Sequence, residues 1–374
     1  MTDNGVVPRL LHTADWQLGK QYKGLGGDPD CRSDLRNERL NAVRRLGALA
    51  VEHGADAVLV AGDVFDMNEV GDRLVRQTLN TLAEFRVPWV LLPGNHDPAL
   101  AESVWTRIAR LGCPANVHLA ITHTPILLAE DRVAILPAPL LRRHESADPT
   151  AVLASTLTPP GVIRVGLAHG SVKNRLPMEA EARNPISDAC AVTACLDYLA
   201  LGDWHGTFQV TPNTWYSGTP EPDGFTQQNS GHALLVDIDA AGAAPRIQKL
   251  QTGAYRWRRL KLDFRAVEGE LAALGEPYGN LVIGMRGEGS ISLRERAALD
   301  ELINDWEARV KLLRVNMALV AAPTDADFDD LGRQGFTGNL VERLRAVQRD
   351  AQHPDHAFAS AALQRLYTEH VLGR

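Results

Sequence analysis

The most constraining feature of this sequence is the alternation of short apolar runs with longer helical patterns over residues 9–112. Each run is rich in β-branched and aliphatic residues, and each helical pattern repeats apolar residues every three or four positions. This order predicts strand, helix, strand units, which build a mainly parallel α/β sheet with helices on its faces. The expected strands are RLLHTAD (9–15), AVLVAGD (57–63) and VPWVLLPGNHD (87–97), and the expected helices cover 35–54, 72–86 and 99–112.

Beyond about residue 115 the expected strands lie closer together, which predicts a second sheet stacked on the first, with helices outside. These strands cover 117–119, 126–129, 132–136, 162–168, 198–201, 208–210, 215–218 and 233–238. From about residue 257 the pattern becomes strand, helix, strand, helix, strand, and two helical segments follow. We therefore expect an α/β protein of three parts: two stacked mixed β-sheets flanked by helices (1–255), a small C-terminal α/β cap (256–335) and a helical tail (336–374).

Composition limits the classes of function. The 374 residues are 45% hydrophobic and 23% charged, as in an ordinary globular protein, and no apolar run approaches the roughly 18 residues of a membrane span. The start, MTDNGVVPRLLHTADW, lacks a cationic segment followed by a long apolar one, so we expect a cytoplasmic protein without a membrane partner. A net charge of −7 argues against wrapping duplex nucleic acid by bulk electrostatics, but allows a local basic groove. The four cysteines lack C-x-x-C spacing and are expected to be reduced.

Polar residues follow five of the expected strands at the point where each strand ends. In open α/β sheets this carboxyl edge is where ligands bind. A single Asp or Asn there is more often a helix cap or turn former, and a lone histidine is as often a satisfied core residue. Five such strand ends are hard to assign to turns, so we expect one site of oxygen and imidazole groups. Its candidates are Asp15, Gln17, Asp63, Asn95, His96, Asp97, His169, Asp203 and His205.

Five short stretches carry a resemblance to a known family. In chain order they are HTADWQLG, GDVFD, GNHD, AHGS and GDWHG. They resemble the ordered motifs of the calcineurin-like metallophosphoesterases, most closely the branch that holds the bacterial nuclease SbcD. The match spans about residues 9–240, and WYSGTPEPDGF (215–225) resembles the segment after the last motif in that branch. The sequence is also similar to a bacterial clade called MPE, DNA endonucleases associated with Lhr-helicase repair gene clusters.

The resemblance implies two divalent metal ions bridged by one carboxylate, which would come from Asp63 and would offset the repulsion between the ions. A solvent hydroxide between the ions would be the nucleophile. His96 would bond the phosphate and protonate the leaving oxygen, and Asp97 would hold its ring. The implied ligands are Asp15, Gln17, Asp63 and His205 for one ion, and Asp63, Asn95, His169 and Asp203 for the other.

The chain departs from the family at two ligand positions. Gln17 and Asp203 stand where the motifs usually have histidines. Both can bind a metal through oxygen, and more oxygen among the ligands favours Mn²⁺ or Mg²⁺ over softer ions. We therefore expect manganese, with the neutral carbonyl of Gln17 as the weakest donor.

Three functions of different classes fit these features. The first is a metal-dependent DNA nuclease acting in repair as a single-strand endonuclease, with an exonuclease left open. YRWRRLKLDFR (255–265) interleaves cations with aromatics, as single-strand-binding surfaces do, although an ordinary amphipathic strand fits equally well. The second is a small-molecule phosphodiesterase or phosphatase, and the third is a non-catalytic scaffold.

The expected partner is DNA. The resemblance also implies an SbcC-like ATPase or an Lhr-type helicase as a protein partner. Two expected helices, 339–350 and 355–372, would suit a coiled-coil partner. The sequence leaves the oligomeric state open.

Overall fold

The structure, a computed structural model, describes residues 7–26, 29–175, 184–226, 229–261, 267–291, 293–321, 328 and 335–371. The chain divides into two compact units, Met1–Trp257 and Arg258–Arg374. Among the described residues, no helix has the length and apolar character needed to cross a membrane. The four cysteines are free thiols, as expected.

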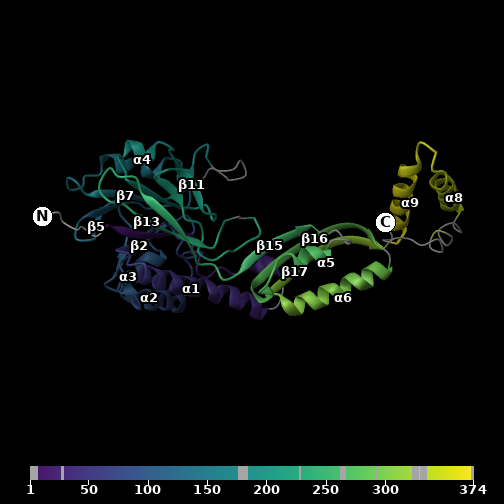
Figure 1. The fold of residues 1–374 in the computed structure, drawn as a ribbon, viewed down its shortest axis with the longest axis horizontal. Helices are drawn as coiled ribbons and strands as arrows, with labels where there is room; N and C mark the ends of the chain where they lie inside the picture. Colours follow the sequence, from purple (N-terminus) through teal and green to yellow (C-terminus); the bar gives the residue numbers. More distant parts are fainter. Residues whose placement is uncertain are drawn as a thin grey trace. The chain divides into compact units, whose positions relative to one another are not determined.

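The first unit contains a six-stranded mixed sheet. Its spatial order is β14 (Arg246–Gln251), β13 (His232–Asp237), β1 (Arg9–Thr13), β2 (Ala57–Val60), β3 (Trp89–Leu91) and β4 (Val117–Leu119). Strands β1 to β4 are parallel, whereas β13 runs antiparallel to β1 and to β14. Three helices cover one face of this sheet: α1 (Pro29–Glu52), α2 (Asp72–Ala83) and α3 (Val104–Leu111) (Figure 1).

A second six-stranded mixed sheet lies in the same unit. Its order is β11 (Phe208–Thr211), β12 (Thr214–Tyr216), β10 (Tyr198–Gly202), β7 (Ile163–His169), β6 (Val133–Ala138) and β5 (Ile126–Leu128). The four inner strands are parallel, and the edge strands β5 and β11 are antiparallel to their neighbours. The remaining short elements are η1 (Lys23–Leu25), η2 (Pro149–Ser155), β8 (Ser171–Val172), β9 (Pro185–Ile186) and α4 (Cys190–Thr193).

The two sheets share an apolar layer, which confirms the expected stacking. Leu59 and Leu234 of the first sheet belong to the same buried cluster as Ile135, Val165 and Ala200 of the second. Because successive strand residues point to opposite faces, the other face of each sheet remains for the helices. Fully burying one such aliphatic side chain contributes roughly 1.5–3 kcal/mol to the stability of the fold. The shared layer therefore holds the two sheets against each other.

Two strands expected in the second sheet belong to the first. Residues 117–119 form β4 beside β3, and residues 233–238 correspond to β13, which pairs with β1. Strand β14 was not expected at all. The periodicity of a strand shows which side chains are buried but not which strand is its neighbour, so this assignment from the sequence was wrong.

The second unit has the expected order of strand, helix, strand, helix, strand. Its elements are β15 (Arg256–Lys261), which begins at the unit boundary, α5 (Val267–Ala272), η3 (Tyr278–Asn280), β16 (Leu281–Ile291), α6 (Leu293–Arg309) and β17 (Leu312–Ala321). The strands form a sheet in the order β15, β16, β17, and one face packs on α5 and α6. Helices α8 (Gly335–Arg349) and α9 (His356–Val371) follow and pack together through Val341 and Leu363.

Candidate metal centre

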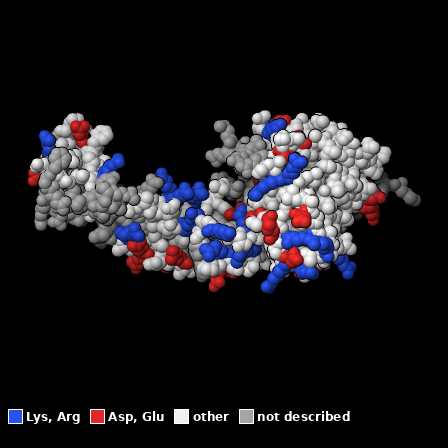
Figure 2. Space-filling model, turned by 180° about the vertical axis from the view of Figure 1, so that it is seen from behind, with Lys and Arg blue, Asp and Glu red and all other residues white. Residues whose placement is uncertain are grey.

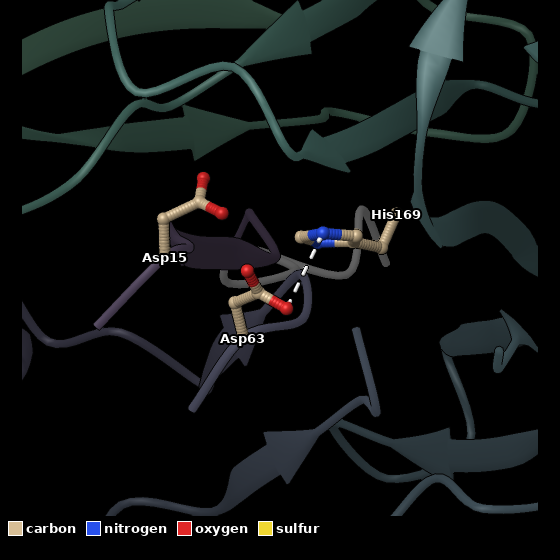
Figure 3. A group of neighbouring side chains, drawn as sticks. All are labelled: Asp15, Asp63 and His169. Carbon is tan, nitrogen blue, oxygen red and sulfur yellow. Dashed lines mark ion pairs between the residues drawn. The ribbon is translucent and has the colours of Figure 1, made fainter. Parts of the chain in front are cut away.

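The predicted site residues lie at the carboxyl edges of both sheets of the first unit. The first sheet supplies the residues that follow β1, β2 and β3, and the second supplies those at the ends of β7 and β10. Figure 3 shows Asp15, Asp63 and His169 with their polar groups converging from these different strands. One ligand atom from each of the three lies within 4.8 Å of the others, as a shared metal ion requires.

The turns that carry these residues have an unusual backbone. Asp15, Gln17, Asp63 and Asp203 have φ values of 55°, 42°, 52° and 100°, in the left-handed region that non-glycine residues rarely adopt. The glycine of GNHD is required for a different reason, because a Cβ on Gly94 would lie 2.2 Å from Oδ1 of Asp63. Strain and close approach concentrated at the facing edges of the two sheets are typical of a functional site.

His169 is the centre of one half of the site. Its Nδ1–H donates to the carbonyl of Ala61 at 2.8 Å, so Nε2 faces the cluster. Around Nε2 lie three oxygens: Oδ1 of Asn95 at 2.7 Å, Oδ1 of Asp63 at 3.5 Å and Oδ1 of Asp203 at 3.7 Å. All three are acceptors, so a cation or a proton must lie among them.

Burial and charge act in opposite directions on these groups. Burial lowers the pKa of His169, but Asp63, Asp15 and Asp203 outweigh it and raise the pKa to about 9. Burial raises the pKa of Asp15 to about 6, although His205 and His169 oppose the shift. The buried carboxylates thus lack enough protein cations to balance them, which is the donor set that a hard divalent ion fits.

The other half of the site contains Gln17 and His205. Burial lowers the pKa of His205, but Asp223 and Asp15 raise it above its ordinary value. Its Nδ1–H donates to Asp223 at 3.2 Å, which turns Nε2 towards Asp15, 4.0 Å away, and Gln17, 3.3 Å away. A carboxylate behind an imidazole is a common support for a metal-binding histidine.

His96 differs from the other candidates because its side chain is 30% exposed. Its backbone N–H donates to Oδ1 of Asp63 at 2.9 Å, and its Nδ1–H donates to the carbonyl of Asp66 at 2.9 Å. Nε2 therefore remains for a substrate, 3.9 Å from Oδ2 of Asp63.

We expected Asp97 to hold the ring of His96, but in the structure its carboxylate binds backbone N–H groups instead. The two carboxylate oxygens of Asp97 accept the backbone N–H groups of Gly94 at 2.8 Å and Phe65 at 2.9 Å. Asp97 therefore shapes the GNHD turn, and the carbonyl of Asp66 orients the His96 ring. In a tight turn an Asp side chain bonds nearby backbone N–H groups readily, and this competing use is the physical reason for the difference.

Three supporting residues were missed from the sequence. Arg39 of α1 is buried, and its guanidinium donates to the carbonyls of Asp15 at 2.9 Å and Trp16 at 2.6 Å. Asp223 and Lys20 lie behind His205 and Gln17, 2.5 Å apart. Arg39 could have been found, because it falls on the apolar stripe of its helix with Leu35 and Val43.

Comparisons with known proteins agree with this geometry. The family described as calcineurin-like phosphoesterase matches residues 8–163. The SbcD component of the nuclease SbcCD from Rhodobacter capsulatus is 29% identical, over 87% of this chain and 91% of that protein. The DNA double-strand break repair protein Mre11 of Sulfurisphaera tokodaii is 24% identical, over 72% of this chain and 69% of that protein. The chain therefore contains a calcineurin-like metallophosphoesterase domain, and it is a homologue of SbcD and Mre11 at modest identity.

Proposed function

We propose that this chain is a metal-dependent phosphodiesterase that cleaves single-stranded DNA as an endonuclease in DNA repair, with Mn²⁺ as its ion. The observation that carries the proposal is the buried cluster of Asp15, Asp63 and His169 beside the partly exposed imidazole of His96. Divalent ions in that cluster would supply a Lewis acid for the phosphoryl oxygen and lower the pKa of bound water. An acid is still needed at the leaving group.

His96 suits the role of that acid. Its Nδ1–H is fixed by the carbonyl of Asp66, so Nε2 of this partly exposed side chain is the atom that can carry a proton to a leaving alkoxide. Asp63 accepts the backbone N–H of His96, which ties the position of the acid to the proposed bridging carboxylate. Asn95, His169 and Asp203 would complete the ligands of one ion, and Asp15, Gln17 and His205 those of the other.

The second unit offers a surface that suits a nucleic acid backbone. In β17 the alternate residues Leu313, Val315 and Met317 pack towards the helices, which leaves Arg314 and Asn316 on the opposite face. Lys and Arg side chains gather on this unit in Figure 2. The open face has a hollow of about 780 Å³, lined by Arg259, Leu260, Lys261, Arg286, Gly287, Asn316 and Ala318.

The same strand limits how bases could bind. Trp257, expected among the stacking aromatics, is only 8% exposed and packs against Tyr22 and Phe225 with ring centroids 6.2 and 4.9 Å away. Phe264 and Arg265 lie outside the described residues. The exposed cations of β15 and β16 therefore support backbone binding, and the part of the prediction that used Trp257 for stacking was wrong.

The helical pair α8 and α9 supports a protein partner. Phe358 of α9 is 74% exposed, although large apolar side chains are usually buried. The R. capsulatus relative is named as a component of the SbcCD nuclease. We propose an SbcC-like ATPase as the partner, and an Lhr-type helicase as the alternative, to be separated by co-purification of the wild type and Phe358→Ser with each candidate.

The central experiment incubates the purified chain with circular and linear single-stranded DNA and with duplex DNA, in Mn²⁺, Mg²⁺ or chelator. We expect circular single strands to be cut in Mn²⁺ and no cutting in chelator. Intact circles with shortened linear strands would indicate an exonuclease. Hydrolysis of mononucleotides or bis-p-nitrophenyl phosphate with no cleavage of any DNA would replace the proposal by the small-molecule phosphodiesterase, and no hydrolysis at all would favour the scaffold.

His96 can be tested separately from metal binding. His96→Ala should retain the metal content of the wild type, yet lose about 10²–10⁴-fold in rate on DNA, whose alkoxide leaving group needs a proton. On bis-p-nitrophenyl phosphate the loss should be much smaller, because nitrophenolate leaves without protonation. A metal-free variant, or equal losses on both substrates, would show that His96 is a ligand or a phosphate clamp.

A further inference from the structure

Four side chains beside the acidic cluster form a closed ring of hydrogen bonds. Nζ of Lys20 donates to Oε1 of Gln17 at 2.7 Å and to Oδ2 of Asp223 at 2.5 Å. The amide nitrogen of Gln17 lies 3.3 Å from Nε2 of His205, and Nδ1 of His205 lies 3.2 Å from Asp223. The ring therefore returns to the carboxylate that Lys20 also binds.

The chemistry of Lys20 fixes the direction of every bond in this ring. An ammonium group only donates, so the acceptor beside it must be the carbonyl oxygen of Gln17. The NH₂ group of Gln17 then faces the site, where it donates to Oδ2 of Asp63 at 3.3 Å and to the lone pair on Nε2 of His205. His205 in turn donates its Nδ1–H to Asp223.

This orientation is the opposite of what a metal ligand needs. A glutamine binds a cation through its carbonyl oxygen, but here that oxygen faces Lys20 and the NH₂ group faces the site. Turning the amide round would place its NH₂ group against the ammonium, where two donors meet. The lone pair of His205 Nε2 is also occupied in the ring.

The half of the site around His169 has no such ring. Its Asn95, Asp63 and Asp203 oxygens all face Nε2 of His169 as acceptors. Both halves contain two carboxylates, because Asp63 lies near Gln17 as well as near His169. The half around Gln17 has a cation at its rim in addition, because Lys20 lies 2.7 Å from the Gln17 oxygen. A positive charge beside a cation site weakens binding there.

We propose that the ring of Lys20, Gln17, His205 and Asp223 closes one of the two metal positions, so that the chain binds one divalent ion tightly and a second only after the ring opens. This inference rests on the proposed function for the existence of the site, but it concerns the number of ions and not the substrate. Lys20 is then a residue that sets metal occupancy.

The test measures metal binding and not activity. Equilibrium dialysis against Mn²⁺ at pH 8 should give one tight ion per wild-type chain and a second ion with a dissociation constant at least about tenfold higher. Lys20→Met and Gln17→His should each bring the two constants closer together. Lys23→Met removes an exposed lysine three residues along the chain and should behave as the wild type.

Electron paramagnetic resonance of the same samples provides an independent readout. With one equivalent of Mn²⁺ the wild type should give the spectrum of an isolated ion, and Lys20→Met should show spin-coupled pairs with two equivalents at concentrations that leave the wild type uncoupled. Two equally tight ions in the wild type would overturn the inference, and so would weak second binding that persists in both Lys20→Met and Gln17→His. Either of these results would leave the proposed function standing, because DNA cleavage tests that function separately. A chain that binds one tight ion but cleaves no DNA would contradict the proposed function and leave this inference standing.

Discussion

Replacing Arg39 by methionine should destabilise the first unit more than any exposed substitution on the same helix. The guanidinium makes five hydrogen bonds: to the carbonyls of Trp16, Asp15 and Glu221, to Oη of Tyr22 and to Oγ1 of Thr219. The carboxylate of Asp223 lies 3.9 Å away. Arg39 thereby connects the turn after β1 to a segment about 180 residues further along the chain.

The magnitude follows from what each partner would lose. The carbonyl of Asp15 would keep its bond from Thr219, and Asp223 would keep Lys20 and His205. The carbonyl of Trp16 would be buried without the bond that Arg39 supplies, which costs about 1–3 kcal/mol. With the loss of the charged bonds to the other groups, we expect about 3–5 kcal/mol in total.

Calorimetry of the full chain would measure this loss. For a unit of this size, 1 kcal/mol shifts the melting temperature by roughly 2–4 °C, so Arg39→Met should melt roughly 6–20 °C below the wild type. Arg44→Met, an exposed position on the same helix, should stay within about 0.5 kcal/mol of the wild type. Arg39→Lys should lie between them, since an ammonium cannot reach all five acceptors. Equal stability of the Arg39→Met and Arg44→Met proteins would refute this reasoning.

Three further predictions concern the site and the core. Gly94→Ala should reduce the rate of hydrolysis of bis-p-nitrophenyl phosphate at least about 100-fold, because the added Cβ would displace Asp63. Gly71→Ala should keep the wild-type rate, because its Cβ would meet open space. Asp63→Ala should lose more activity than Gln17→Ala, and comparable residual rates would contradict the bridging role. Burial lowers the pKa of His12 to about 3, so the unfolded chain takes up a proton below pH 6.5 that the folded chain does not. Stability should therefore fall from pH 6.5 towards 3 by up to about 1.4 kcal/mol per pH unit, and urea titrations of His12→Gln should lack this part of the slope.

The sequence predicts the ligand-bearing edge well because that edge depends on local features. An apolar run followed by Gly62 and Asp63, or by Gly94 and Asn95, specifies both a strand end and a polar group at it, and parallel strands place such ends together. Each candidate thus needed only its own neighbours in the chain to be recognised.

The supporting residues could not be predicted in the same way. Arg39 contacts Glu221, and Lys20 contacts Asp223, pairs separated by 182 and 203 positions, and no local pattern contains both members. The role of Asp97 was predicted wrongly for a related reason. A carboxylate can accept a hydrogen bond from an imidazole or from a backbone N–H, and only the geometry of the turn selects between them. The partners of β4 and β13 likewise depend on which edge of the first sheet is free.

The supporting residues stabilise a strained backbone at the site. Non-glycine residues held in the left-handed region cost of order 1–3 kcal/mol each, and Asp15, Gln17, Asp63 and Asp203 all have such φ values. Backbone hydrogen bonds offset part of this cost in free energy. Asp15 and Gln17 donate their N–H groups to the carbonyls of Gly62 and Asp63. Arg39 and Thr219 hold the carbonyl of Asp15 from the other side. Glycine at these positions would relieve the strain but would remove the ligand, so the fold keeps the strained residue and stabilises the turn around it.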